Sequence, residues 1–242
     1  MTQSWSVLER VETPDGTLEL RRRGERDFLI LLAGRVLMNA AAHRSEQTLA
    51  SEACARLHGN ARPRVLIGGL GMGFTLRAAL DALPPAARIT LVELHPCVVS
   101  WCQGVLAPLT HAAVRDPRVE IELGDVALTI RRAAASGGSA RFDAILLDLY
   151  TGPGPTAGGG EPCYEADMLA LTRAALAPGG IYAAWSERPD PGFERRLRTA
   201  GFAAARSRPG RGGLRHAVYT AQPASDGSAA KLRVTKLAGG DG

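Results

Sequence analysis

The segment from Arg64 to Glu93 constrains the fold of this chain more than any other stretch. It starts with a short apolar run at residues 65–67, continues with a glycine cluster, and follows a helical pattern over residues 74–83. A second apolar run at residues 89–92 ends on the acid Glu93. The succession of strand, glycine turn, helix, strand and acid is typical of a nucleotide-binding βαβ unit. We therefore predict a ligand-binding α/β domain built on this segment.

The spacing of the glycines argues against a dinucleotide ligand. A G-x-G-x-x-G signature would need glycine at position 74 or 76, where the chain has Phe and Leu. The motif is instead Gly69-x-Gly71-x-Gly73, which favours a nucleoside ligand such as S-adenosylmethionine over NAD. Glu93 follows at a spacing that lets its carboxylate accept hydrogen bonds from both ribose hydroxyls. The alternative is that the glycines only form a tight strand-to-helix turn.

Acidic residues stand at the ends of four predicted strands. From position 64 onward strands alternate with helices, which predicts a parallel sheet covered on both faces. Among its strands we expect residues 119–123, 142–147 and 181–185, the last of them after a helix that is ended by the Pro-Gly-Gly of residues 178–180. Glu93, Asp125, Asp148 and Glu187 would then meet at one edge of the sheet, where open α/β folds bind their ligands. Glu93 suits a ribose, and Asp125 suits the exocyclic amine of an adenine. A lone acid at a strand end is more often a helix cap, so capping remains the alternative, for Asp125 in particular.

Residues 1–60 differ in pattern from the rest of the chain. Two strand pairs, one around Pro14-Asp15-Gly16 and one around Gly34, predict a small antiparallel β-domain. A linking helix is expected over residues 45–57. We expect a nucleoside-binding catalytic domain over residues 61–221 and a disordered tail over residues 222–242, which lack aromatic side chains. The Gly- and Pro-rich segment 149–162 is long enough to be either a functional loop or a disordered segment.

Composition excludes several classes of function. The formal charge is +5, but only two of the 29 basic residues are lysines, and the abundance of Arg, Ala, Gly and Pro indicates a coding bias. We therefore do not expect nucleic-acid binding. The four cysteines form no C-x-x-C pattern, so no metal is expected. The polar N-terminus and the short apolar run at residues 28–33 predict no membrane segment and a cytoplasmic protein.

Five stretches of the chain resemble a known family. They are LIGGLGMGFTLRAAL, LVELHP, DPRVEIELGD, FDAILLDLYTGPGP and YEADMLALTRAALAPGGIYAAWSE. Together they resemble the spermidine synthase-like (polyamine biosynthesis) group of class I S-adenosylmethionine-dependent methyltransferase-fold proteins, over roughly residues 35–202. The resemblance implies a Rossmann-like class I methyltransferase fold, with a mostly parallel seven-stranded sheet, helices on both faces and a small N-terminal antiparallel β-domain. It also implies that Glu93 holds the ribose, that Asp125 holds the adenine, and that Asp148 is the base that takes a proton from the attacking amine. The loop at 149–162 would close over the substrates.

The chain departs from the resembled aminopropyltransferases at three places. Those enzymes carry GGGDGG in the first turn, whereas the turn from Gly68 to Gly73 has no acid. Their second Asp, three positions after the catalytic one, is replaced by Thr151. Their Tyr-His-Glu triplet is absent near residues 49–51. A polyamine is a flexible dication whose binding needs several carboxylates and aromatic rings.

These departures order three hypotheses. The first is methyl transfer from S-adenosylmethionine to a small-molecule nucleophile, with Asp148 as the base. The second is an aminopropyltransferase that uses decarboxylated S-adenosylmethionine and has a divergent acceptor site. The third is a non-catalytic nucleoside-binding or partner-binding protein that kept the fold. For Asp148 itself, the alternative is that it only caps its loop.

The predicted site has a base, a donor-binding part and an acceptor-binding part. The base is Asp148. The cofactor-binding residues are Gly68, Gly69, Leu70, Gly71, Gly73, Glu93, Leu94, Asp125 and Val126. The substrate-binding residues are Asn39, Tyr150, Thr151 and Glu187. The expected ligands are S-adenosylmethionine or its decarboxylated form and a small-molecule substrate, with an amine as one option, and a homodimer is left open.

Overall fold

The fold is that of a computed structural model, which describes residues 4–150, 152, 163–209 and 216–224. The chain begins with a four-stranded antiparallel sheet in the order β1-β2-β3-β4. Its strands are β1 (Ser6–Thr13), β2 (Gly16–Arg23), β3 (Asp27–Leu32) and β4 (Arg35–Asn39). The two predicted strand pairs and their turns are therefore confirmed. We call these four strands the small sheet.

A seven-stranded sheet follows, in the order β10-β11-β9-β8-β5-β6-β7. Five neighbouring strands pair in parallel, in the order β9-β8-β5-β6-β7. Strand β11 is antiparallel to both β9 and β10. The strands are β5 (Arg64–Gly68), β6 (Arg88–Glu93), β7 (Val119–Leu123), β8 (Phe142–Leu147), β9 (Leu176–Ser186), β10 (Phe202–Ser207) and β11 (Ala217–Pro223). We call this the large sheet, and it confirms the predicted fold class.

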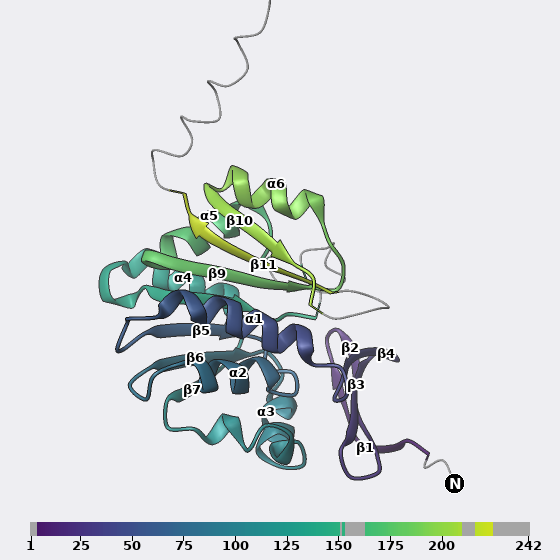
Figure 1. Ribbon diagram of the computed structural model, residues 1–242. Helices are drawn as coiled ribbons and strands as arrows, with labels where there is room; N and C mark the ends of the chain where they lie inside the picture. Colours follow the sequence, from purple (N-terminus) through teal and green to yellow (C-terminus); the bar gives the residue numbers. More distant parts are fainter. Residues whose placement is uncertain (1–3, 151, 153–162, 210–215, 225–242) are drawn as a thin grey trace, which may run out of the picture.

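Helices cover both faces of the large sheet (Figure 1). The α-helices are α1 (Arg44–Cys54), α2 (Phe74–Ala82), α3 (Pro96–Gln103), α4 (Val126–Ser136), α5 (Ala166–Ala175) and α6 (Pro191–Thr199). Short 3-10 turns lie at Ala55–Leu57, Ala107–Leu109, Ala113–Arg115 and Gly138–Ala140. Among the described helices, none is both long enough and apolar enough to cross a membrane.

Alternation along the strands divides the interior into two apolar clusters. In β5, Val65 and Ile67 pack with α1, α2 and α3, while Leu66 packs with α4, α5 and α6 on the opposite face. Successive side chains of a strand point to opposite faces, so a strand covered on both sides is apolar throughout. Leu20 and Ile30 of the small sheet join the first cluster. The expected division at residue 60 stays a prediction, because the small sheet and α1 share this cluster with the large sheet.

Two sequence predictions were wrong in detail. Residues 178–180 were expected to end a helix and form a loop, but they lie within β9, which begins at Leu176 opposite Phe142. The pairing of β8 and β9 shifts register just after this point, so the strand accommodates Pro and Gly as an irregularity. Gln222 was assigned to the tail, but it pairs with Ala203 in β11. The remainder of the expected tail, residues 225–242, lies outside the described residues.

The Asp116 and Arg118 pair anchors the start of β7. The Arg118 guanidinium donates to both carboxylate oxygens of Asp116 and to the carbonyl oxygens of Leu80 and Leu83, which end α2. Its hydrogen bonds hold the pKa of Asp116 below its ordinary value. One guanidinium thus ties the β7 edge of the large sheet to the helix of the βαβ unit.

Arg118→Ala should lower the free energy of unfolding by about 1–3 kcal/mol near pH 7, because it removes the guanidinium that donates to Asp116 and to two carbonyl groups. A carboxyl whose pKa is lowered by folding stabilises the protein above its unfolded pKa, and that contribution is lost as the pH falls through the folded pKa. The difference from the wild type, measured by urea denaturation, should therefore narrow near pH 3. Arg88→Ala, at an exposed position of β6, is the control; equal losses for the two variants would contradict the assignment.

Candidate active site

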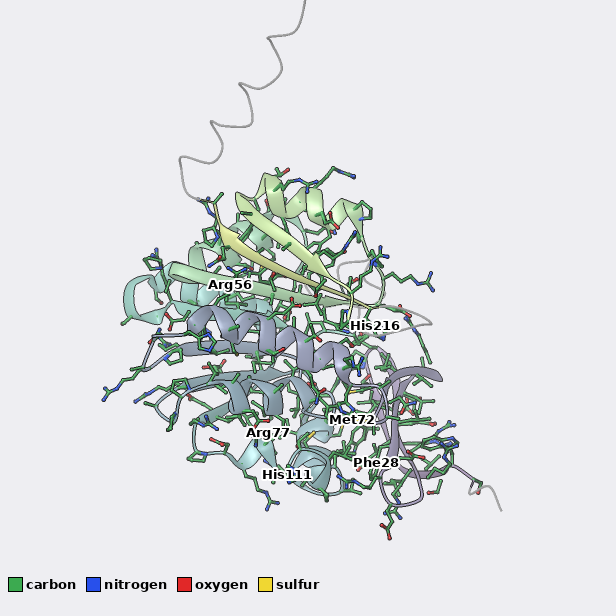
Figure 2. The ribbon with its side chains drawn as sticks, in the orientation of Figure 1. Phe28, Arg56, Met72, Arg77, His111 and His216 are labelled. Atoms are coloured by element: carbon green, nitrogen blue, oxygen red, sulfur yellow. The ribbon has the colours of Figure 1, made fainter. Side chains whose placement is uncertain are left out.

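A cavity opens at the carboxyl ends of β5, β6 and β8 and is closed on its other side by the small sheet. The strand ends contribute Gly69, Glu93 and Asp148, and the small sheet contributes an apolar wall. That wall consists of Leu18, Ile30, Leu32, Leu37 and Met38. Figure 2 labels Phe28 on the small sheet and Met72 in the glycine turn, on the two sides of this junction. Chain order reverses between β8 and β5, which is where open α/β sheets form their ligand crevice.

The glycine turn joins three strand ends. The Gly69 N–H donates to Val92 O at 2.9 Å, and the Asp148 N–H donates to Gly68 O at 2.8 Å. Gly69 has a φ of +89° and lies against the backbone of Asp148, so a Cβ at this position would collide with the Asp148 carbonyl oxygen. Glycine is the residue that accepts both the positive φ and the close approach. The turn therefore brings the ends of β6 and β8 together.

Glu93 is held by the backbone on both of its carboxylate oxygens. Its Oε2 accepts from the Leu70 N–H at 2.8 Å, and its Oε1 accepts from the His95 N–H at 2.9 Å. The residue is 6% exposed, yet it lines the cavity. Each oxygen retains a lone pair, so the fixed carboxylate can accept further hydrogen bonds from a hydroxyl pair in the cavity.

Asp125 combines two of the roles considered from the sequence. Its Oδ1 accepts from the Ala127 N–H at 2.9 Å and caps α4, so the capping hypothesis is confirmed. It also lines the cavity together with Val126 and Gly124. Contact with an adenine through its second oxygen stays a prediction.

Asp148 lies at the inner wall of the cavity beside a second carboxyl group. Its Oδ2 accepts from the Thr75 hydroxyl at 2.6 Å. Burial, and then the neighbouring Glu46 carboxylate, raise the pKa of Asp148 to about 7, while the Thr75 hydrogen bond lowers it. A carboxyl group poised near neutral pH can accept a proton far more readily than an ordinary aspartate.

Tyr150 lines the cavity close to Asp15, which belongs to the turn between β1 and β2. Burial raises the pKa of the Tyr150 phenol first, and the charge and hydrogen bond of Asp15 raise it further. The phenol is therefore a neutral donor over the physiological pH range. A carboxylate of the small sheet thus reaches the same space as the strand-end acids.

The other predicted cofactor-binding residues either support the glycine turn or line the cavity. Leu70 is buried beneath the turn, Gly73 forms the N-terminal cap of α2, and a Cβ at Gly68 would collide with the neighbouring core. Gly71 and Leu94 line the cavity.

Asn39 and Glu187 are not brought to the cavity lining as the structure describes it. The Asn39 Oδ1 accepts from the Ala41 N–H at 2.9 Å, and Glu187 accepts from Arg35 at 2.6 Å because the ends of β4 and β9 lie together. Substrate roles for the two residues stay predictions. Thr151 lies outside the described residues, as does most of the predicted gating loop.

Comparison with known proteins assigns the family. Residues 46–192 match the family model described as the spermine/spermidine synthase domain. The chain belongs to this family.

Family relatives include two kinds of transferase. The chain is 38% identical over 124 residues to the polyamine aminopropyltransferase of Corynebacterium efficiens, covering 51% of this chain and 22% of that protein. It is 31% identical over 160 residues to the polyamine aminopropyltransferase of Mycobacterium tuberculosis H37Rv, covering 66% and 29%. It is 33% identical over 124 residues to putrescine N-methyltransferase 2 of Nicotiana tabacum, covering 51% and 32%. The matched segment thus spans about a third or less of each of these relatives.

Solved structures of the family share the fold. Spermidine synthase from Thermotoga maritima aligns with a TM-score of 0.68 at 20% identity, covering 89% of this chain and 72% of that one. A spermidine synthase in complex with the transition state analogue AdoDATO aligns with a TM-score of 0.71 at 21% identity, covering 92% and 75%. At this level of identity the likeness concerns the fold alone.

Two carboxylates of this family member were missed by the sequence predictions. Glu46 stands near the start of α1, and Asp15 stands in a turn that predicted only a hairpin. Both line the cavity. Glu46 directly follows Ser45 at the start of a predicted helix, so the sequence suggested a role in starting that helix and gave no sign of a site residue. Nothing in the local sequence distinguishes Asp15 from any other turn aspartate.

Gly69→Ala should lower the free energy of unfolding by at least about 2 kcal/mol, because the methyl group adds a collision to the unfavourable φ. Gly34→Ala is the matched control, since Gly34 also has a positive φ, +78°, but a Cβ there meets nothing within 4 Å. Urea denaturation of both variants measures the difference. Equal losses would contradict the close contact with the Asp148 backbone.

Asp148→Asn should raise the midpoint of thermal unfolding more at pH 8 than at pH 5. The folded pKa of about 7 lies above the ordinary value of 3.8, so this carboxyl group favours the folded state at low pH, and the benefit is lost as pH rises through 7. Asparagine removes the need to bury a charge at pH 8. We expect a gain on the order of 5 °C at pH 8. The exposed Asp167→Asn serves as control, and equal gains at both pH values would contradict the raised pKa.

Proposed function

We propose that the protein transfers an aminopropyl group from decarboxylated S-adenosylmethionine to a small amine, with Asp148 as the base. The sequence had ranked methyl transfer first, because acids of the resembled aminopropyltransferases are missing. The aminopropyltransferase relatives and the electrostatics of the cavity both support the alternative.

The observation that carries this proposal is the charge of the cavity wall. Five carboxyl groups line it: Asp15, Glu46, Glu93, Asp125 and Asp148. Neither Lys nor Arg is among its described lining residues. A carboxylate on the ligand would face these acids without a cationic partner, at a cost on the order of 1–4 kcal/mol for each close contact. Decarboxylated S-adenosylmethionine lacks that carboxylate, and an amine acceptor adds positive charge.

The residues present fit such a donor. The backbone at Gly69 and Gly71 borders the cavity without side chains, and the fixed carboxylate of Glu93 offers acceptors for ribose hydroxyls. Asp125 would approach the adenine. The donor supplies a sulfonium-activated carbon. These residues would hold it in one orientation, and such alignment can provide an effective molarity on the order of 10⁵ M or more.

Asp148 would complete the chemistry by taking a proton from the acceptor ammonium. The neutral nitrogen then forms the new N–C bond while the C–S bond breaks and its electron pair stays on sulfur. The base returns its proton to solvent after the product leaves. Thr75 fixes the carboxylate orientation through its 2.6 Å hydrogen bond. A positioned base contributes roughly 10²–10⁴-fold to the rate.

Methyl transfer is the second candidate, supported by one local feature. A side chain at Gly71 would collide with Met38, whose sulfur also accepts from the Met72 N–H at 3.1 Å. The turn would therefore accept the acid that the resembled aminopropyltransferases carry only if the end of the Met38 side chain moved away. The putrescine N-methyltransferase relatives support the same candidate.

A cytoplasmic location and a homodimer remain parts of the proposal.

A transfer assay with a panel of diamines separates the candidates. We expect mass spectrometry to detect an aminopropylated product with decarboxylated S-adenosylmethionine and little methylated product with S-adenosylmethionine. Asp148→Asn should reduce turnover at least about 100-fold, and Asp167→Asn should leave it unchanged. Methylated product alone would overturn the proposal in favour of the second candidate. Turnover of Asp148→Asn within a few-fold of the wild type would exclude Asp148 as the base.

A further inference from the structure

Glu46 is a buried carboxylate that the proposed reaction leaves without a role. It is 5% exposed and lines the same cavity as Asp148. In the part of the chain that the structure describes, no Lys or Arg forms an ion pair with either residue. Burying a carboxylate without a cationic partner is unfavourable, so its position next to a second acid suggests a role that compensates for this cost.

Thr75 links the two carboxyl-bearing residues. Its hydroxyl donates to Asp148 Oδ2 at 2.6 Å and lies 3.5 Å from the backbone oxygen of Glu46. The Glu46 Oε2 accepts from the Ser45 hydroxyl at 2.6 Å, which fixes the carboxylate. Helix α1 and the N-terminal turn of α2 thus hold a second carboxyl group beside the end of β8.

We propose that Glu46 is a positioning residue that acts through Asp148: its carboxylate, fixed beside the base, makes Asp148 hold a proton more tightly and so strengthens it as the acceptor of the amine proton. The inference rests on the proposed function. Two like charges in a desolvated site cannot both ionise freely, so proton uptake by one relieves the repulsion. The Glu46 charge is the second cause, after burial, of the raised pKa of Asp148.

Other titratable groups face this pair from neighbouring elements. Tyr164 and Cys163 precede α5, Tyr150 follows β8, and Glu93 ends β6. Burial raises the pKa of the Tyr164 phenol well above its ordinary value, so it is neutral near pH 7. Both Glu93 oxygens accept backbone N–H groups, which offsets its charge. Glu46 is therefore the neighbour expected to control the base.

Glu46→Gln tests this role because it keeps the shape of the side chain and removes the charge. We expect the acidic limb of the pH profile of kcat to move down by about 1 pH unit, and kcat on the plateau to fall several-fold. The matched control is Glu52→Gln on the same helix, outside the described cavity lining, which should leave the profile unchanged. An unmoved limb in Glu46→Gln, with or without a loss of stability, would overturn the proposal.

A direct titration keeps the inference separate from the proposed reaction. Carbon-13 NMR of the Asp148 side chain follows its protonation in the free protein, and its midpoint should lie lower in Glu46→Gln than in the wild type. If the wild type transfers no aminopropyl group, the proposed function is wrong. The comparison of midpoints still tests whether Glu46 affects the protonation of Asp148. If Glu46→Gln does not fold, Glu46→Asp is the second variant, and in it the titration midpoint of Asp148 should stay above that of an ordinary aspartate. Equal midpoints in the wild type and Glu46→Gln, or an ordinary midpoint in a folded Glu46→Asp, would contradict the coupling.

Discussion

The contact between the Gly69 backbone and the Asp148 backbone determines how the rest of the site can be built. Two hydrogen bonds, from Gly69 N–H to Val92 O and from Asp148 N–H to Gly68 O, hold the ends of β5, β6 and β8 together. A Cβ at position 69 would collide with the Asp148 carbonyl oxygen, so the backbone at one of these strand ends would have to shift. Because the contact exists, Glu93 and Asp148 emerge on one side of the turn. The need for glycine at position 69 and the positions of these two carboxyl groups thus have the same cause, the close contact between the strand ends.

The opposite wall of the cavity comes from parts of the chain that precede the βαβ unit. The small sheet supplies an apolar surface and Asp15, and α1 supplies Glu46. Acids from both walls therefore share one partly desolvated space, which raises the pKa of Asp148. Unneutralised carboxylates reduce stability, and a cationic ligand relieves that repulsion. The proposed preference for cationic substrates over ligands that carry their own carboxylate rests on this balance.

The sequence predicted the large sheet well because apolar alternation and glycine spacing are local signals. The limits of β7 and β8 were predicted to the residue, and Glu93, Asp125 and Asp148 do meet at one cavity. Local signals do not report which distant elements pack together. Glu46 and Asp15 were missed, and Glu187 was expected in the site although β4 brings Arg35 to it. The start of β9 was missed because Pro and Gly ordinarily mark loops.

Calorimetric binding of the two donors tests the central claim most directly, because it measures the preference of the acidic cavity without depending on the acceptor. The account predicts that decarboxylated S-adenosylmethionine binds at least about tenfold more tightly than S-adenosylmethionine, a difference of about 1.4 kcal/mol. Equal affinities, or tighter binding of the carboxylate-bearing donor, would contradict it.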